Sequence, residues 1–214
     1  MGRSVTSDPA AGSPASSRHV SRKRKQRIST ILHTAAITFA ELGYEQANLE
    51  GIAARLDMRG PSLYYYFSSK DDLLMACLDH TAAAVTGRAR ETAGGPGSAR
   101  QVLRRLLADQ VLVQIRDFPE FMPLFMRLQV PNPEVSAHIQ RLRRDHGDVY
   151  RHVVDEGIRR GELTAEDSHR ALLNAFGAVA YVQEWYRPGR AFDAEELARE
   201  TADQLLRMFR RPRR

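Results

Sequence analysis

Apolar residues recur every three or four positions along most of the chain, which is the spacing of one face of an α-helix. The first such face, on a helix that ends at Gly43, carries Ile28, Ile31, Leu32, Ala35 and Phe39. No extended run of alternating apolar and polar residues bounded by turn dipeptides occurs, so no strand is expected. The pattern predicts an all-α protein of about nine helices.

Glycines, prolines and capping residues divide the pattern in the N-terminal third. A short helix around 49–56 is followed by a turn at 57–59 and by a very short helix with Pro61 near its start, where a missing N–H is tolerated. Ser69 is expected to cap a longer fourth helix, which the Gly-Gly-Pro run at 94–96 ends. Two short helices joined by a tight turn predict a helix-turn-helix.

The remaining helices are predicted from the same signals. A helix that includes Val102 stops near Pro119, and a short segment rich in Phe and Met covers 121–130. Asn132 and Pro133 mark the start of a long helix that ends at Gly161. The last two helices are expected over about 165–186 and 194–209, with Thr164 and Asp193 as N-caps and Glu196 at capping-box spacing.

The composition excludes several classes of protein. Of 214 residues, 43% are hydrophobic, which is enough for a sizeable core. The longest apolar stretch, 171–182, is interrupted by Asn174 and is too short to cross a bilayer, and residues 1–21 lack the apolar centre of a secretory signal. Cys77 is the single cysteine, so no internal disulfide is possible. We expect a soluble, cytoplasmic protein that does not associate with membranes.

The net charge of +6 is concentrated near the N-terminus. Residues 1–70 hold 10 Lys and Arg against 5 Asp and Glu, whereas residues 71–214 hold 22 against 21. This asymmetry favours a head that binds a polyanion, joined to an almost neutral body. A solvated basic surface is the alternative, so charge alone favours nucleic acid only slightly.

A specific motif covers Phe39–Leu74, which reads FAELGYEQANLEGIAARLDMRGPSLYYYFSSKDDLL. It closely resembles the DNA-binding domain of the TetR/AcrR family of transcriptional regulators over about residues 27–78, a quarter of the chain. The positions in the register of the family are Phe39, Gly43, Tyr44, Ile52, Ala53, Leu56, Leu63, Tyr64, Phe67, Lys70, Leu73 and Leu74. The resemblance implies a helix-turn-helix DNA-binding domain over 22–70, preceded by a flexible, basic-leaning arm at 1–21. It also implies an effector-binding and dimerisation domain over 71–214.

The resemblance also implies which residues contact DNA. Arg59, Gly60 and Ser62 are expected to face base edges, and Tyr64, Tyr66 and Lys70 to reach the phosphate backbone. Asn48 matches a position that caps the second helix and touches phosphate. Each has a structural alternative: an ordinary surface charge for Arg59, a packed ring for Tyr64 and an acidic partner for Lys70.

Three further positions in the motif lead to separate expectations. Tyr65 is expected in the core. Asp57 stands where the family usually has a turn glycine, and Gly60 stands where a side chain is frequent, so base reading depends more on Arg59 and Ser62.

The basic residues Arg22, Lys23, Arg24 and Lys25 precede the first helix. They can follow the phosphates or enter the minor groove, and a solvated tail is equally open.

The body is expected to dimerise through its last two helices. Residues 171–182 are apolar nearly all round, and the last helix carries a wide apolar stripe, so both need cover on two sides. A four-helix interface with a second copy supplies that cover, and burial within one chain is the alternative. The expected interface residues are Phe176, Val179, Leu197, Leu205 and Phe209.

A cluster of Phe and Met is expected to line an effector pocket. Its members are Phe121, Met122, Phe125 and Met126, with Asn174 and Arg127 as polar contacts, and plain core packing remains open. The segment 185–188 resembles the last-helix junction of family members that answer to acyl-CoA thioesters. The effector is therefore expected to be a small hydrophobic molecule or an acyl-CoA. The phosphates of an acyl-CoA would need basic groups, for which the candidates are Arg116, Arg127, Arg187 and Arg190.

No catalytic or metal-binding constellation is present in the sequence. The seven histidines include no His-Glu-x-x-His motif, and neither a phosphate-cradling glycine loop nor a nucleophile elbow occurs. We therefore expect no enzyme activity, no metal and no cofactor. The sequence predicts a dimeric, ligand-responsive repressor of a palindromic, double-stranded DNA operator. The alternatives are a helical small-molecule-binding or enzyme domain without specific DNA binding and, third, a protein–protein adaptor.

Overall fold

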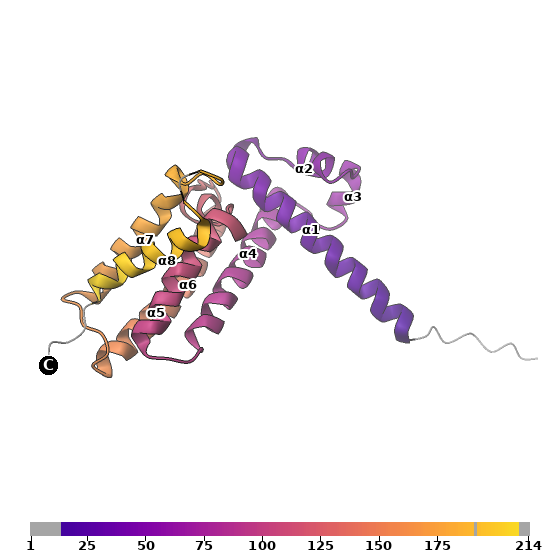
Figure 1. Cartoon of the computed structure of the whole chain (residues 1–214). Helices are drawn as coiled ribbons and strands as arrows, with labels where there is room; N and C mark the ends of the chain where they lie inside the picture. The colour runs from indigo at the N-terminus through magenta and orange to yellow at the C-terminus, as the bar shows by residue number, and fades with distance from the viewer. Residues whose placement is uncertain (1–13, 191, 210–214) are drawn as a thin grey trace, which may run out of the picture.

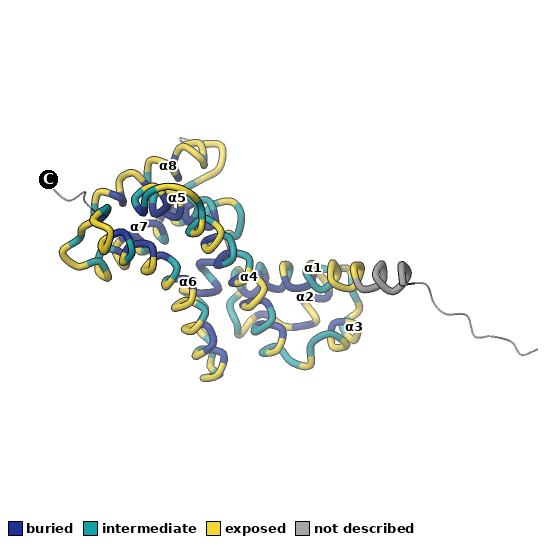
Figure 2. The backbone as a smooth tube through the Cα atoms, turned by 90° about the horizontal axis from the view of Figure 1, so that it is seen from below, coloured by how far each residue is buried: buried dark blue, intermediate teal, exposed yellow. Residues whose placement is uncertain are grey.

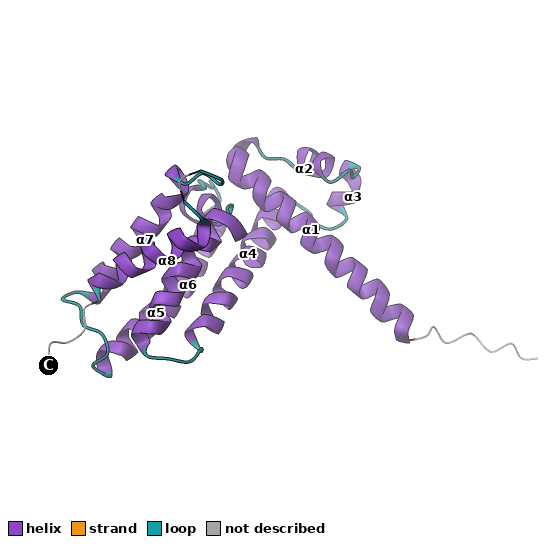
Figure 3. Ribbon diagram, in the orientation of Figure 1, coloured by secondary structure: helices purple, strands orange, loops and turns teal. Residues whose placement is uncertain are grey.

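The computed structural model describes residues 14–190 and 192–209, and every regular element in these ranges is helical (Figure 3). The α-helices are α1 (Pro14–Gln46), α2 (Leu49–Arg55), α3 (Gly60–Tyr64), α4 (Lys70–Ala93), α5 (Ala99–Leu112), α6 (Pro133–Arg159), α7 (Ser168–Trp185) and α8 (Ala194–Leu205). Two π-helical turns, η1 (Val113–Asp117) and η2 (Pro123–Arg127), and one 3₁₀ turn, η3 (Leu206–Met208), complete the list. The predicted all-α fold is confirmed.

The helices form a small head and a larger body (Figure 1). The head consists of α1–α3, and the body consists of α4–α8. Helix α4 runs from the head along the body and packs on both α1 and α6, while α5 packs on α6, α7 and α8. The N-terminal part of α1 projects beyond the head, away from the body (Figures 1 and 2). No helix in the described ranges is long and apolar enough to cross a membrane.

Side-chain caps fix most helix starts where the sequence predicts them. Asn48 accepts a hydrogen bond from the backbone N–H of Gly51 at 2.7 Å, and Ser69 accepts one from Asp72 at 3.0 Å. Asn132 caps α6 by accepting from Glu134 at 2.9 Å. Such caps satisfy backbone donors that have no partner within the helix. The boundaries of α2, α4 and α6 therefore follow from local sequence.

Two predicted boundaries are wrong. Helix α1 begins at Pro14, so residues 14–21 are helical rather than part of a flexible arm, whose other residues, 1–13, lie outside the described ranges. Proline is favoured in a first helical turn, and no helix breaker separates it from the basic run. Helix α7 is capped by Asp167 rather than Thr164, because the Asp167 carboxylate accepts from the backbone N–H of Arg170 at 2.9 Å.

The buried apolar residues form two clusters. The first joins α1–α4 and also contains Phe121, Met122 and Phe125, so the core of the head continues into the body beneath η2. The second is formed mainly by α5–α8, with Ala89 of α4, and includes Tyr150 and Phe209, which are both fully buried. Side chains of the body that belong to the first cluster can therefore transmit a displacement to the head.

Candidate functional site

The head holds α3 against α2 through a small apolar core. Ile52, Ala53 and Leu63 are each completely buried, and Leu56 and Phe67 are packed against the same cluster. Because Leu63 occupies the inward position of this single-turn helix, the other side chains of α3 point toward solvent. The turn before it is made by Asp57, whose φ of 52° is left-handed, a region that asparagine and aspartate enter more readily than most residues.

The outward face of α3 brings together several of the residues expected to contact DNA. Arg59 is the N-cap residue of α3 and is exposed, as is Ser62 one turn further on. Gly60 begins the helix, and because it has no side chain, the backbone between Arg59 and Ser62 is uncovered. A shallow groove on this face is lined by Arg27, Asp57, Met58, Arg59, Ser62, Tyr65 and Tyr66. Arg27 of α1 thus supplies a second basic group beside the start of α3.

The three consecutive tyrosines have different environments. Tyr65 is 78% exposed, so its predicted place in the core is wrong. It follows directly on the five residues of α3 and packs edge to face on the half-buried Tyr66, with ring centroids 5.3 Å apart. Tyr64 donates from its hydroxyl to Glu50 of α2 at 3.0 Å, and this hydrogen bond raises the pKa of the phenol. Tyr64 thus joins α3 to α2 by a hydrogen bond, although about half of the residue remains exposed.

The ammonium group of Lys70 binds another part of the same chain. Its Nζ donates to the backbone carbonyl oxygen of Tyr44 at 2.8 Å and lies 4.0 Å from the centroid of the Tyr44 ring. Its partners are backbone carbonyl oxygens at the end of α1 rather than an acidic side chain. Cations are favoured at helix C-termini, where carbonyl groups lack partners. Lys70 therefore ties α4 to α1, and a phosphate would have to compete for it.

The basic run Arg22, Lys23, Arg24 and Lys25 lies on the projecting part of α1, and all four side chains are exposed. A helix carries these charges as a rigid extension of the head (Figure 1). Four adjacent residues span about one helical turn, so their side chains point in several directions around the helix. Only some of them can therefore face one DNA backbone at a time.

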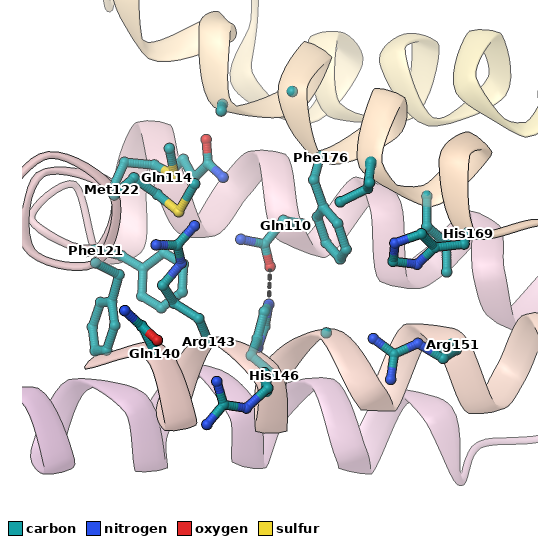
Figure 4. A pocket seen from close by; sticks show the side chains of 18 residues that line it. Gln110, Gln114, Phe121, Met122, Gln140, Arg143, His146, Arg151, His169 and Phe176 are labelled. Atoms are coloured by element: carbon teal, nitrogen blue, oxygen red, sulfur yellow. Dashed lines mark hydrogen bonds between the residues drawn. The ribbon is translucent and has the colours of Figure 1, made fainter. Parts of the chain in front are cut away.

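The body contains a pocket of about 540 Å³ between α5, α6 and α7 (Figure 4). All four predicted apolar residues line it: Phe121, Met122, Phe125 and Met126. The apolar lining is completed by Leu172, Leu173, Phe176 and Ala180 of α7. The two predicted polar residues lie elsewhere. Arg127 forms an ion pair with Glu184, and Asn174 is exposed on α7 without lining the pocket.

The basic residues of the pocket come from α6 and were not predicted. Arg143, Arg144 and Arg151 line it together with His169 of α7, and no Asp or Glu belongs to the lining, although Arg151 also pairs with Asp148. Three of the four Arg candidates from the sequence are engaged elsewhere: Arg116 pairs with Asp117 and Glu195, Arg127 pairs with Glu184, and Arg187 donates to a backbone carbonyl. The helical spacing of Gln140, Arg143, Gly147 and Arg151 was a usable signal, because it places them along one face of α6.

A buried polar network forms the floor of the pocket. His146 interacts with Thr86 of α4 at 3.2 Å and with Gln110 of α5 at 3.0 Å. The Tyr150 hydroxyl donates to the same Gln110 carbonyl oxygen at 2.9 Å. Burial lowers the pKa of His146 to about 4, so the imidazole is neutral at physiological pH. Three helices of the body are therefore joined by polar contacts beneath the pocket.

Comparison with protein families identifies this arrangement. A family model described as "Bacterial regulatory proteins, tetR family" matches residues 31–77, which cover most of the head and the start of α4. A second, described as "Tetracyclin repressor-like, C-terminal domain", matches residues 96–209, more than half of the chain. The chain belongs to the TetR/AcrR family. The resemblance of Phe39–Leu74 to the DNA-binding domain of that family is therefore confirmed. TetR-family proteins are DNA-binding transcriptional regulators.

Individual relatives agree with the family in fold. The fatty acid metabolism regulator protein of Bacillus subtilis is 20% identical over 187 residues, which is 86% of this chain and 96% of that protein. A TetR/AcrR-family regulator from Thermobifida fusca is 29% identical, with a TM-score of 0.66 over 87% of this chain and 100% of that one. The B. subtilis regulator FadR, solved in complex with stearoyl-CoA, is 21% identical with a TM-score of 0.69 over 83% of this chain and 97% of that one.

In this TetR-family chain the five residues expected at a dimer interface pack inside the protomer. Val179, Leu197, Leu205 and Phe209 are between 0% and 6% exposed, and the half-buried Phe176 lines the pocket. A different row of α7 residues is exposed instead, and it begins with Leu173 and Gly177, which also line the pocket. Leu173, Tyr181 and Trp185 are exposed, and Gly177 continues the same four-residue spacing. We call Leu173, Gly177, Tyr181 and Trp185 the α7 stripe.

Proposed function

We propose that this protein is a dimeric repressor that an acyl-CoA thioester releases from a palindromic operator. The observation that carries the proposal is the composition of the pocket. An apolar interior large enough for an acyl chain opens beside three arginines and a histidine, and no carboxylate lines it. Arginine binds phosphate well, because its guanidinium matches the geometry of the phosphate oxygens. Arg151 also pairs with Asp148, whereas Arg143 and Arg144 have no ion-pair partner among the described residues, so these two are available to a phosphate.

The DNA-binding surface is proposed to be the outward face of α3 with the adjoining part of α1. Arg59 and Ser62 are exposed there and can reach base edges, while Arg27 and the basic run on α1 can approach phosphates. In a two-fold dimer the two copies of α3 would enter successive major grooves, which accounts for a palindromic operator.

The α7 stripe is proposed as the dimer interface. Exposed large apolar side chains at four-residue spacing lie on one side of a helix, and packing against a second copy would remove them from water. Trp185 and Phe192 extend the apolar surface, with ring centroids 6.2 Å apart. A two-fold axis through α7 would make this contact self-complementary.

Effector binding is proposed to act on the head through the first apolar cluster. Phe121, Met122 and Phe125 line the pocket and belong to the cluster that contains the buried residues of α1 and α4. A ligand that moves these side chains changes the packing beneath the head. It releases DNA only in so far as it binds the released conformation more tightly than the DNA-bound one.

Binding of the purified protein to its own upstream intergenic DNA, followed by titration with effectors, tests the proposal. We expect salt-sensitive, sequence-selective binding that long-chain acyl-CoA reverses at lower concentration than the free acid or a neutral analogue. Arg143→Ala combined with Arg151→Ala should weaken the thioester far more than the free acid, while Arg187→Ala serves as the control. If neutral aromatics release DNA and thioesters do not, the pocket is a general hydrophobic sensor. Absence of selective DNA binding would favour the helical ligand-binding or enzyme domain.

A further inference from the structure

The mouth of the pocket has two different sides. The lining residues that are also exposed on α6 are polar, and they include Arg143 and Arg151 (Figure 4). Along α7, after His169 in its first turn, the exposed lining residues are apolar: Leu173, which is 56% exposed, and Gly177. An exposed leucine beside an apolar interior means that this wall of the pocket is incomplete within a single protomer.

The space in front of Gly177 is open. A Cβ atom added to this glycine would have no heavy atom of another part of the described chain within 4 Å. Because glycine has no side chain, a second molecule can approach the helix backbone closely at this position. The protomer therefore leaves room beside Gly177, at the rim of a cavity whose deeper walls are buried side chains such as Phe121 and Leu172.

The same two α7 residues begin the α7 stripe. Tyr181 and Trp185, its other members, are 67% and 44% exposed and do not line the pocket of their own protomer. A two-fold axis that crosses α7 at right angles makes the two copies of the helix antiparallel, and each residue then meets the one at the same distance beyond the axis. With the axis at the centre of the stripe, Tyr181 of the partner subunit lies opposite Gly177, and Trp185 of the partner subunit lies opposite Leu173.

This pairing matches large side chains to uncovered positions. The ring of Tyr181 meets a glycine that has open space in front of it, and the ring of Trp185 meets the exposed leucine. Both contacts lie at the apolar side of the mouth, whereas the arginines of α6 lie across the pocket from α7 (Figure 4). A second copy would thus cover the apolar side and leave the basic side in water.

We infer that the effector pocket is completed by the second copy of the chain, whose Tyr181 ring closes the mouth over Gly177. The acyl chain of an effector is then covered by both subunits, while its phosphates bind the arginines of α6. This inference rests on the proposed function for the position of the dimer interface. Effector binding and dimerisation are linked in consequence: a ligand that binds the dimer more tightly than the monomer strengthens the dimer by the same factor for each pocket.

Calorimetric titration of the full chain with lauroyl-CoA, with sedimentation velocity on the same samples, tests the inference. Tyr181→Lys and Trp185→Lys should each give a folded monomer that keeps its own pocket lining intact. We expect these monomers to bind lauroyl-CoA roughly tenfold more weakly than the wild type, which corresponds to about 55 Å² of apolar ligand surface left uncovered. Lysine is chosen because a new carboxylate near the mouth would repel the phosphates. Thr164→Lys, at an exposed position outside α7, is the control and should bind as the wild type does.

Dilution of the wild type supplies a second measurement that needs no variant. Saturating lauroyl-CoA should lower the dimer dissociation constant by about a hundredfold, since each of the two pockets contributes a factor of about ten. An unchanged dissociation constant, or monomeric variants that bind lauroyl-CoA as tightly as the wild type, would overturn the inference and leave the acyl-CoA proposal intact. Variants that remain dimeric would also overturn it, because the α7 stripe would not be the interface.

Free lauric acid separates this inference from the proposed effector. If lauroyl-CoA does not bind but lauric acid does, and the monomeric variants bind the acid about tenfold more weakly, the acyl-CoA proposal fails and the shared pocket stands. If neither compound binds the wild type, both are wrong. Circular dichroism and the melting temperature of each variant verify that a loss of affinity does not reflect unfolding.

Discussion

The side-chain amide of Asn132 donates a hydrogen bond of 2.7 Å to the carboxylate of Asp71, which joins the start of α6 to the start of α4. Asp71 also accepts from the hydroxyl of Tyr44 in the head at 2.5 Å. The hydrogen bond from Tyr44 and then that from Asn132 lower the pKa of Asp71, so the carboxylate stays ionised. The carboxylate of Asp71 thus connects the pocket helix α6 to the head.

We predict that Asn132→Asp weakens the effect of effector on DNA binding. The new carboxylate can still accept from Glu134 as the cap of α6, but it repels Asp71 instead of donating to it. Coupling between two sites is usually about 1–3 kcal/mol, and the variant should lose a measurable part of it. Fluorescence anisotropy of labelled operator with and without effector gives the coupling directly.

Asn132→Ser is the matched control for the cap, because serine also caps helices but cannot reach Asp71 in the same way. Both variants should lose coupling, with the larger loss in Asn132→Asp. Unchanged effector response in both variants would show that the contact between α6 and Asp71 takes no part in release.

Arg59→Ala is predicted to relax the choice of operator sequence. An arginine that contacts a base edge contributes roughly 1–3 kcal/mol of discrimination, so each half-site should lose about that much specific affinity. Selection from a randomised operator library should show one position per half-site that no longer matters. If the variant keeps the full sequence preference, Arg59 is an ordinary surface charge that contacts no base edge.

Lys70→Ala and Arg24→Ala should differ in what they change. Arg24 is exposed on α1, so its loss should lower the salt dependence of DNA binding by about one unit per half-site without affecting stability. Lys70 binds the end of α1, so its loss should lower the melting temperature as well. A Lys70→Ala protein of unchanged stability and reduced salt dependence would return Lys70 to the phosphate role.

The two positions Tyr181 and Leu205 are predicted to respond differently to a charge. Tyr181→Glu places a carboxylate on the exposed α7 stripe and should give a folded monomer. Leu205→Glu buries an unpaired charge in the protomer core and should unfold it. Sedimentation velocity at low micromolar concentration, with circular dichroism as the check on folding, distinguishes the two. A Tyr181→Glu dimer would indicate a different interface.

Stability should fall as the pH decreases from 6.5 to about 4, because of His146. The ordinary pKa of 6.5 applies to the unfolded chain, whereas burial holds the folded value near 4. Between these values the unfolded state binds more protons, so acid favours unfolding, by up to about 3 kcal/mol for this group. Urea titrations across this range should show the loss, and His146→Gln should reduce it. An unchanged pH dependence in that variant would contradict the assignment.

Local sequence determines the helices and most of their boundaries. Asn48, Ser69 and Asn132 satisfy backbone donors two or three residues away, so the sequence alone is enough to place the starts of α2, α4 and α6. The helix-turn-helix is predictable for the same reason, since its core depends on the spacing of a few apolar residues within one short segment. Asp57 adopts the left-handed turn conformation that the register demands.

Only the tertiary structure decides which residues meet from distant parts of the chain. Helix α7 is apolar on most sides, so its periodicity could not show that Phe176 faces the pocket while Tyr181 faces outward. Surface arginines are frequent, and the convergence of Arg143 and Arg151 on the Phe and Met cluster depends on how α6 crosses α5. The sequence by itself therefore determined the helices and the helix-turn-helix, because short-range spacing and capping encode them, but it left open whether the Phe and Met cluster is core or pocket. The spacing of Arg143 and Arg151 places both on one face of α6, but only helix packing decides that this face borders the pocket and that the α7 stripe is exposed.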